Sequence, residues 1–191
     1  GNNGTLTNGP TFSSANGGSI VLDGTNDYIS LPTVGFGVPS LTVEVWFKQY
    51  SSNNAGYIWI MDNYDNPELR LGFLNNRIAA AFYDNGGYIV NFITSTTTLN
   101  TTSFFNVTST ITNNSQKVYI NGSLEITGSG NYDGNSSNNL IEQTLGTYNR
   151  PRDGYNGYAT IQYGAYRVYN RVLTAAEVLQ NYNAQKDRFG L

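Results

Sequence analysis

Short runs of alternating apolar and polar residues dominate this chain, and helical periodicity is nearly absent. The clearest run is LTVEVWF at residues 41–47, where every second side chain is apolar and alternates with Thr42, Glu44 and Trp46. A period of two is that of a β-strand with one face in a core. Asn-Gly, Asp-Gly and Gly-Gly pairs separate about a dozen such runs. The pattern predicts an all-β fold, in which two antiparallel sheets pack as a sandwich.

Two local signals predict individual elements. In KVYINGSLEI at residues 117–126, Asn121 and Gly122 separate two strand-like runs, and both residue types tolerate the positive φ of a type I′ turn. This segment predicts a β-hairpin. Near the C-terminus, Thr174 and Glu177 have the spacing of a capping box, in which Thr174 is the N-cap and Glu177 reaches back to it. They predict one short C-terminal helix.

The composition narrows the chemistry. The chain has 191 residues, enough for one domain with a real core, but only 12% are charged and the formal net charge is -3. Such a surface is neutral and hydrogen-bonding, so we expect neither nucleic-acid binding nor membrane insertion. Histidine and cysteine are both absent, which excludes His-dependent triads, thiol nucleophiles, the usual zinc sites and disulfides. A metal could be held by oxygen ligands alone, which points to calcium.

The segment DGTND at residues 23–27 lies between two strand-like runs. Asp23, Asn26 and Asp27 offer oxygen ligands that suit calcium, although the order of an EF-hand loop is missing. The preferred interpretation is a turn in a first hairpin, where Asp27 accepts hydrogen bonds from backbone amides. A calcium site remains the alternative.

Two polar and aromatic loops are candidate binding sites, because aromatic rings stack on sugars while amides, carboxylates and guanidinium groups bind hydroxyls. The first is GTYNRPRDGYNGY at residues 146–158, and the second is MDNYDNPE at residues 61–68. The candidate ligand-binding residues are Tyr148, Asn149, Arg150, Arg152, Asp153, Tyr155, Asp62, Tyr64 and Asp65. The alternative is that these are ordinary loop residues, with arginine and aspartate paired to hold the loop.

Glycoside hydrolysis in such folds needs two carboxylates about 5 Å apart that flank one bond. Glu44 is alone on its strand-like run, and the acidic residues of the second loop lie among Asn and Pro. We therefore expect no enzyme activity.

Five segments in order carry a family resemblance: residues 1–12, 18–32, 41–47, 117–126 and 166–191. Together they resemble the concanavalin A-like, laminin G-like jelly-roll domains of bacterial surface proteins and phage structural proteins. The resemblance implies a two-sheet jelly-roll sandwich, a glycan- or protein-binding role and, in some members, a calcium ion at the rim. The chain departs from the family in having Phe104 or Phe105 where a Trp is usual, and Ile161 and Tyr163 where Gly and Ile are usual.

The resemblance sets the functional expectations. Residues 1–191 are expected to form a single laminin G-like domain, the C-terminal part of a longer chain. The favoured function is a non-catalytic phage virion structural or decoration component that could also bind a glycan, because the closing residues 169–191 are similar to the C-termini of phage virion proteins. The alternative is a secreted or cell-surface bacterial carbohydrate-binding or adhesion module. Expected partners are host-surface or environmental glycans and other virion or surface proteins, at a virion surface or outside the cell.

Overall fold

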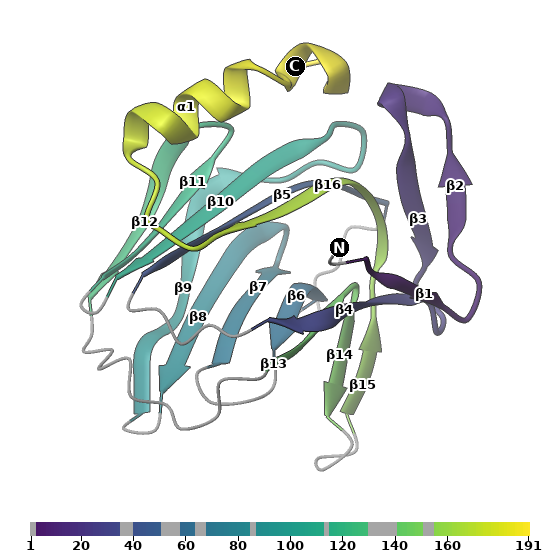
Figure 1. The fold of residues 1–191 in the computed structure, drawn as a ribbon, viewed down its shortest axis with the longest axis horizontal. Helices are drawn as coiled ribbons and strands as arrows, with labels where there is room; N and C mark the ends of the chain where they lie inside the picture. The colour runs from purple at the N-terminus through teal and green to yellow at the C-terminus, as the bar shows by residue number, and fades with distance from the viewer. Residues whose placement is uncertain are drawn as a thin grey trace.

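Two seven-stranded antiparallel sheets form the body of the protein, as the sequence predicted (Figure 1). The computed structural model describes residues 3–34, 40–50, 58–63, 68–84, 87–112, 115–129, 141–150 and 155–191. The first sheet has the order β1 (Thr5–Thr7), β4 (Tyr28–Val34), β13 (Ile141–Leu145), β6 (Ile58–Asn63), β7 (Glu68–Leu74), β8 (Arg77–Asp84) and β9 (Gly87–Thr98). The second has the order β12 (Ser123–Ser129), β11 (Ser115–Ile120), β10 (Phe105–Thr112), β5 (Leu41–Gln49), β16 (Thr160–Tyr169), β3 (Ser19–Asp23) and β2 (Thr11–Ser13).

The core lies between the two sheets and follows the alternation of the sequence. In β5, the alternate residues Leu41, Val43, Val45 and Phe47 belong to the main buried cluster. Phe47 stacks on Phe73 of the first sheet, with ring centroids 6.1 Å apart. Ile161 and Tyr163, which depart from the family pattern, are also buried in this core. The inward-facing residues that the alternation predicts therefore form the core between the two sheets.

The outward-facing side of β5 is buried as well, because the C-terminal segment lies across it (Figure 1). Trp46 is fully buried and stacks on Phe189, with ring centroids 4.4 Å apart, and on Tyr182 at 5.8 Å. Phe104 completes this second cluster. A Cβ on Gly164 would come within 2.3 Å of the Phe189 ring, so glycine is needed where β16 passes beneath it. Trp46 therefore packs on the outer face of the sheet.

The hairpin at residues 117–126 is confirmed. Ile120 pairs with Ser123, which leaves Asn121 and Gly122 as a two-residue turn with φ values of 50° and 79°. Both values are positive, as a type I′ turn requires.

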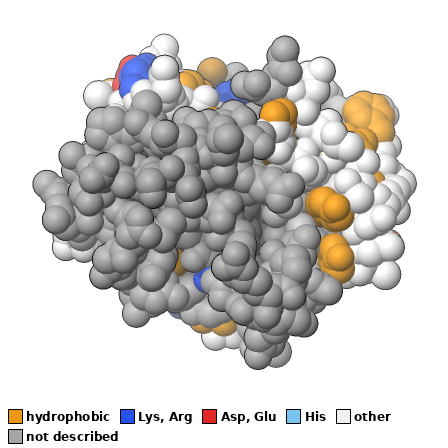
Figure 2. Space-filling view, turned by 60° about the horizontal axis from the view of Figure 1, so that its bottom comes forward, with side chains coloured by type: hydrophobic (Ala, Val, Ile, Leu, Met, Phe, Trp, Pro, Cys, Tyr) orange, Lys and Arg blue, Asp and Glu red, His pale blue; other side chains and the backbone are white. Residues whose placement is uncertain are grey.

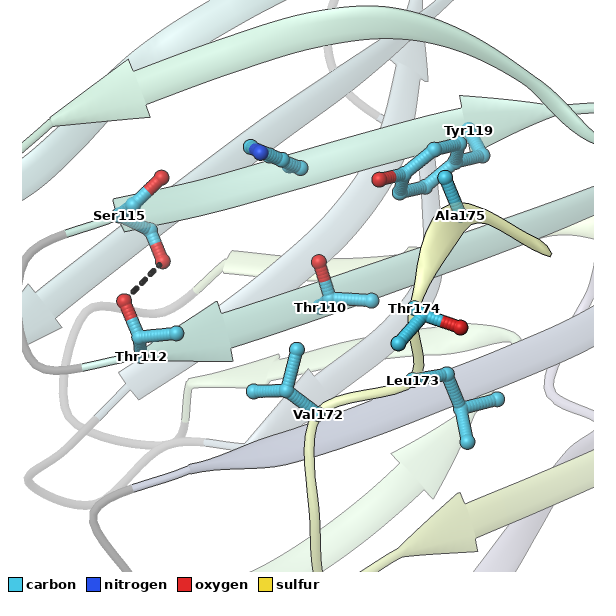
Figure 3. A pocket seen from close by; sticks show the side chains of 9 residues that line it. Thr110, Thr112, Ser115, Tyr119, Val172, Leu173, Thr174 and Ala175 are labelled. Carbon is cyan, nitrogen blue, oxygen red and sulfur yellow. Dashed lines mark hydrogen bonds between the residues drawn. The ribbon is translucent and has the colours of Figure 1, made fainter. Parts of the chain in front are cut away.

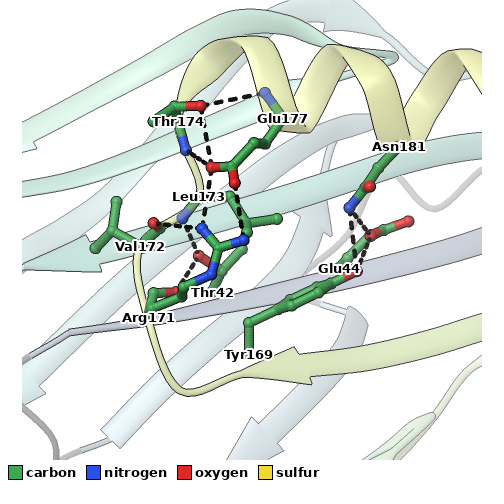
Figure 4. Close-up of polar contacts among 9 residues, drawn as sticks. All are labelled: Thr42, Glu44, Tyr169, Arg171, Val172, Leu173, Thr174, Glu177 and Asn181. Carbon is green, nitrogen blue, oxygen red and sulfur yellow. Dashed lines mark hydrogen bonds and ion pairs between the residues drawn. The ribbon is translucent and has the colours of Figure 1, made fainter.

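The C-terminal helix is also confirmed as α1 (Ala175–Asn183), which a 3-10 turn, η2 (Lys186–Phe189), follows. The Glu177 amide donates to Thr174 Oγ1 at 3.2 Å, and the Thr174 amide donates to Glu177 Oε2 at 2.8 Å, which completes the capping box. The Arg171 guanidinium, with the Thr174 amide and hydroxyl, lowers the pKa of Glu177 to about 2. The carboxylate therefore stays ionised at neutral pH and caps the helix (Figure 4).

The described surface is mostly uncharged, as the composition predicted. On the face drawn in Figure 2, hydrophobic side chains of the described residues occur as separate spots among neutral polar ones. Among the described residues, no helix has the length and apolar character that crossing a lipid bilayer requires.

We predict that Thr174→Ala lowers the free energy of unfolding by about 1 kcal/mol, because the N-cap hydrogen bond to the Glu177 amide is lost. Chemical denaturation followed by tryptophan fluorescence measures this change, since Trp46 packs beneath the C-terminal segment. Thr174→Ser keeps the accepting hydroxyl and is the control that should retain most of the stability. An unchanged midpoint in Thr174→Ala would show that the capping box does not stabilise the helix.

Candidate functional site

A separate two-stranded hairpin carries most of the first predicted binding loop. It consists of β14 (Thr147–Arg150) and β15 (Tyr155–Tyr158) and projects beside β6 (Figure 1). Arg150 is paired with Tyr155 at its outer end, and Asn149 is paired with Asn156. The predicted residues on these strands are Tyr148, Asn149, Arg150 and Tyr155, whereas Arg152 and Asp153 lie outside the described residues. The backbone thus brings the two ends of the predicted loop together at one pair of opposed positions.

The second predicted loop follows β6, against which the β14–β15 hairpin packs. Asp62 lies on β6 and pairs with Thr144 of β13, while Tyr64 and Asp65 lie outside the described residues. Because Thr144 comes before the hairpin in the chain, this register places Asp62 nearer to the base of the hairpin than to its tip. Both predicted regions therefore adjoin strand β6: Asp62 lies on it, and the hairpin packs against it. The Arg150–Tyr155 pair lies at the end of the hairpin that is farther from Asp62.

The loop at residues 23–27 is a tight turn, as preferred from the sequence. The Thr25 amide donates to Asp23 Oδ1 at 2.7 Å, and the Asp23 amide donates to Asp27 Oδ2 at 3.3 Å. Gly24 has a φ of +78°, which suits glycine. Asp27 is buried and accepts a backbone amide, as expected.

The expectation that this turn closes a hairpin was wrong. Strand β3 before it belongs to the second sheet, and β4 after it belongs to the first, so the turn carries the chain between sheets. The Asn26 carbonyl accepts a hydrogen bond from Asn8 Nδ2 at 2.8 Å. Among the described residues, no three acidic side chains gather as a metal site would need. Calcium at Asp23, Asn26 and Asp27 stays a prediction.

Glu44 of β5 is the carboxylate on which the catalytic question depends. It is 1% exposed and lies on the outer face of the second sheet. Its Oε1 accepts from Arg167 Nη1 at 2.9 Å, Trp46 Nε1 at 3.0 Å and Asn106 Nδ2 at 3.4 Å. Its Oε2 accepts from the Tyr169 hydroxyl and from Asn181 Nδ2, each at 3.1 Å (Figure 4). These donors come from β5, β10, β16 and α1.

This environment suits a structural anion and not a reacting one. Five hydrogen bonds engage both oxygens of Glu44, and Arg167 balances its charge. Burial, together with the charge of Glu44, raises the pKa of Tyr169, so the phenol stays protonated and donates. A nucleophile or general acid must be free to reach substrate, which Glu44 is not.

The sequence identified Glu44 as isolated but did not reveal its partners. Arg167 and Asn181 are 123 and 137 residues away along the chain. The one available signal was a charged residue at the centre of an otherwise apolar strand, since such a residue is rarely buried without partners.

Comparison with protein-family models gives one match, described as the concanavalin A-like lectin/glucanases superfamily, over residues 23–179. Comparison with curated protein sequences finds no match. Among solved structures, the binding domain of botulinum neurotoxin serotype G superposes with a TM-score of 0.72 and 16% identity, covering 97% of this chain and 47% of that one.

Two further solved structures give the same result. The receptor-binding domain of the botulinum neurotoxin C/D mosaic serotype has a TM-score of 0.74 and 16% identity, with 96% of this chain and 46% of that one covered. The binding domain of Paraclostridial Mosquitocidal Protein 1 has a TM-score of 0.73 and 16% identity, with 96% and 47% covered. The chain thus spans slightly less than half the length of each of these proteins. At 16% identity the likeness establishes the fold alone.

We predict that Glu44→Ala lowers the free energy of unfolding by about 3 kcal/mol, because it leaves Arg167 Nη1 and the buried Asn106 amide without their acceptor. The value lies at the lower end for a broken buried ion pair, since the Arg167 side chain is 36% exposed. Urea denaturation measures the loss. Glu44→Gln keeps one accepting oxygen and should lose less. Equal stability of Glu44→Ala and the wild type would show that the network does not hold the C-terminal segment.

Proposed function

Since the chain belongs to the concanavalin A-like lectin/glucanase superfamily, we propose that it is a non-catalytic recognition module that binds a glycan through the β14–β15 hairpin. The observation that carries this proposal is the hairpin itself. It is a separate ribbon that packs on β6, and four of its eight strand residues are Tyr148, Asn149, Arg150 and Tyr155. Tyrosine and arginine are the residues most enriched at binding hot spots, and asparagine suits sugar hydroxyls.

The solved neighbours support a binding role. Several are described as binding domains, botulinum neurotoxin type C is described as depending on two ganglioside molecules to enter cells, and the binding domain of neurotoxin DC is described in complex with rat synaptotagmin II. This chain spans less than half of each, so their ligands guide the choice of probes and do not identify this chain's ligand.

We place the module on a surface, as a virion structural or decoration component that attaches to a host glycan. The similarity of residues 169–191 to phage virion C-termini supports this placement. In the structure this segment forms the last residue of β16, α1 and η2, which cover the outer face of the second sheet. A secreted or cell-surface bacterial adhesion module is the second candidate, which the toxin binding domains among the neighbours favour.

A glycan array tests the binding role. We expect the wild-type protein to bind a restricted set of glycans, and Arg150→Ala and Tyr155→Ala each to weaken binding at least tenfold, a loss of about 1.4 kcal/mol. Lys48→Ala is the control, because it removes a basic side chain from β5, whereas the hairpin packs on β6 of the other sheet. Melting temperatures should stay close to that of the wild type. Full binding by a folded Arg150→Ala, Tyr155→Ala double variant would overturn the assignment of the hairpin.

We also predict that the protein releases no reducing ends from β-glucans or galactans, since Glu44, the carboxylate of strand β5, is already engaged by five donors. A colorimetric reducing-end assay over many hours measures this. Release that Glu44→Gln or Asp62→Asn abolishes would identify a hydrolase and contradict the proposed function.

A further inference from the structure

The outer face of strands β10 and β11 carries a row of hydroxyl groups that the C-terminal segment covers incompletely. The register pairs Thr108 with Tyr119, Thr110 with Lys117, and Thr112 with Ser115. Because opposed residues of an antiparallel pair share a face, these side chains lie on the same side as α1. Leu173 and Val178 pack on Tyr119 and cover the first of these pairs.

The remaining pairs line a pocket of about 260 Å³ beside the start of α1. Its walls are Thr110, Thr112, Ser115, Lys117 and Tyr119 on one side and the strip 172–175 on the other (Figure 3). Thr42 fixes that strip, since its hydroxyl donates to the Arg171 carbonyl at 2.8 Å and accepts from the Leu173 amide at 2.9 Å. The pocket is therefore built on strands and an anchored segment.

Two residues at the pocket are nearly buried and their hydroxyls have no hydrogen-bond partner among the described residues, but neither hydroxyl is itself a fully buried atom, so each reaches the open space of the pocket. Thr110 is 4% exposed and Tyr119 is 5% exposed. Figure 3 shows the Tyr119 hydroxyl directed toward the side on which Thr110 and Ser115 lie. Because these hydroxyls reach solvent and have no partner among the described residues, they are available to hydrogen-bond a ligand that displaces water from the pocket. Burial raises the pKa of Tyr119, so at neutral pH its hydroxyl can donate.

The pocket also has an unbalanced positive charge. Lys117 is exposed, lines the pocket and has no side-chain partner among the described residues. Near the start of α1, Arg171 and Glu177 pair with each other at 2.8 Å and so cancel. The whole chain has a net charge of -3, whereas the charge of Lys117 at the pocket is positive. The pocket therefore attracts an anion locally.

We propose that this pocket binds an acidic sugar unit, a pyranose that carries a carboxylate, either free or at the end of a glycan. The ligand carboxylate would pair with Lys117, and its hydroxyls would bond Thr110, Tyr119 and Ser115. Its C–H face would rest on Val172 and Leu173. The proposal does not rest on the β14–β15 hairpin, which lies at the opposite end of the molecule (Figure 1).

Titration of the nitrogen-15-labelled protein with sodium glucuronate tests the site. We expect saturable amide shifts at residues 110–119 and 172–175, and affinity for glucose and for sodium acetate at least tenfold weaker at matched ionic strength. Glucose lacks the charge and acetate lacks the ring. An oligosaccharide that ends in glucuronate distinguishes the two sources: binding at least as tight as free glucuronate assigns the site to glycan ends, and weaker binding assigns it to the free acid.

Variants assign the contacts. Lys117→Met removes the charge from an exposed side chain and should weaken glucuronate binding at least tenfold, whereas Lys48→Met, on the same sheet, should leave it unchanged. Tyr119→Phe removes one hydroxyl, keeps the ring on Val178 and should weaken binding severalfold. Because the shifts are followed at residues 110–119 and 172–175, binding at this pocket is distinguished from binding at the hairpin. Absence of saturable shifts, equal affinity for acetate, or unchanged binding by Lys117→Met would overturn the proposal.

Discussion

A single buried carboxylate joins the C-terminal segment to the sandwich. Glu44 accepts hydrogen bonds from Trp46, Asn106, Arg167, Tyr169 and Asn181. At 1% exposure its desolvation is costly, and only this full set of donors offsets it. Removal of α1 would take away Asn181 and expose the Trp46 rings at the same time. The helix is therefore part of the fold even though it lies outside both sheets.

This constraint divides the outer face of the second sheet into two zones. Trp46 and Glu44 lie beneath the aromatic rings and Asn181 of the C-terminal segment, where no ligand can reach them. Further along β10 and β11, Thr110 and Lys117 line the pocket beside the first residue of α1. The position at which the segment crosses the sheet, set by the bonds of Thr42 to the 171–173 backbone, decides which polar residues stay accessible.

Local chemistry explains what the sequence could predict. The turn at Asn121 and Gly122 needs two positive φ values, and the capping box needs two residues at a fixed spacing. Both can therefore be predicted from a short segment of sequence. The burial of Glu44 could not be predicted, because three of its five partners, Arg167, Tyr169 and Asn181, lie more than 120 residues away along the chain. The 23–27 turn was placed in a hairpin because the same Asp and Gly chemistry serves a turn within a sheet and a turn between sheets. The pocket likewise joins residues 110–119 to 172–175, which no sequence period connects.

The orientation of β5 separates this chain from a catalyst built on the same sandwich. A strand-borne acid serves hydrolysis only if it faces an open groove and has a second carboxylate about 5 Å away. In β5 the alternation sends Val43 and Val45 into the core and Glu44 outward, beneath α1. Any shift that exposed Glu44 to a substrate would break its pairing with Arg167 and unstack Trp46 from Phe189. Stability and hydrolysis thus make opposite demands on this residue, whereas recognition at the hairpin or the pocket leaves the network intact.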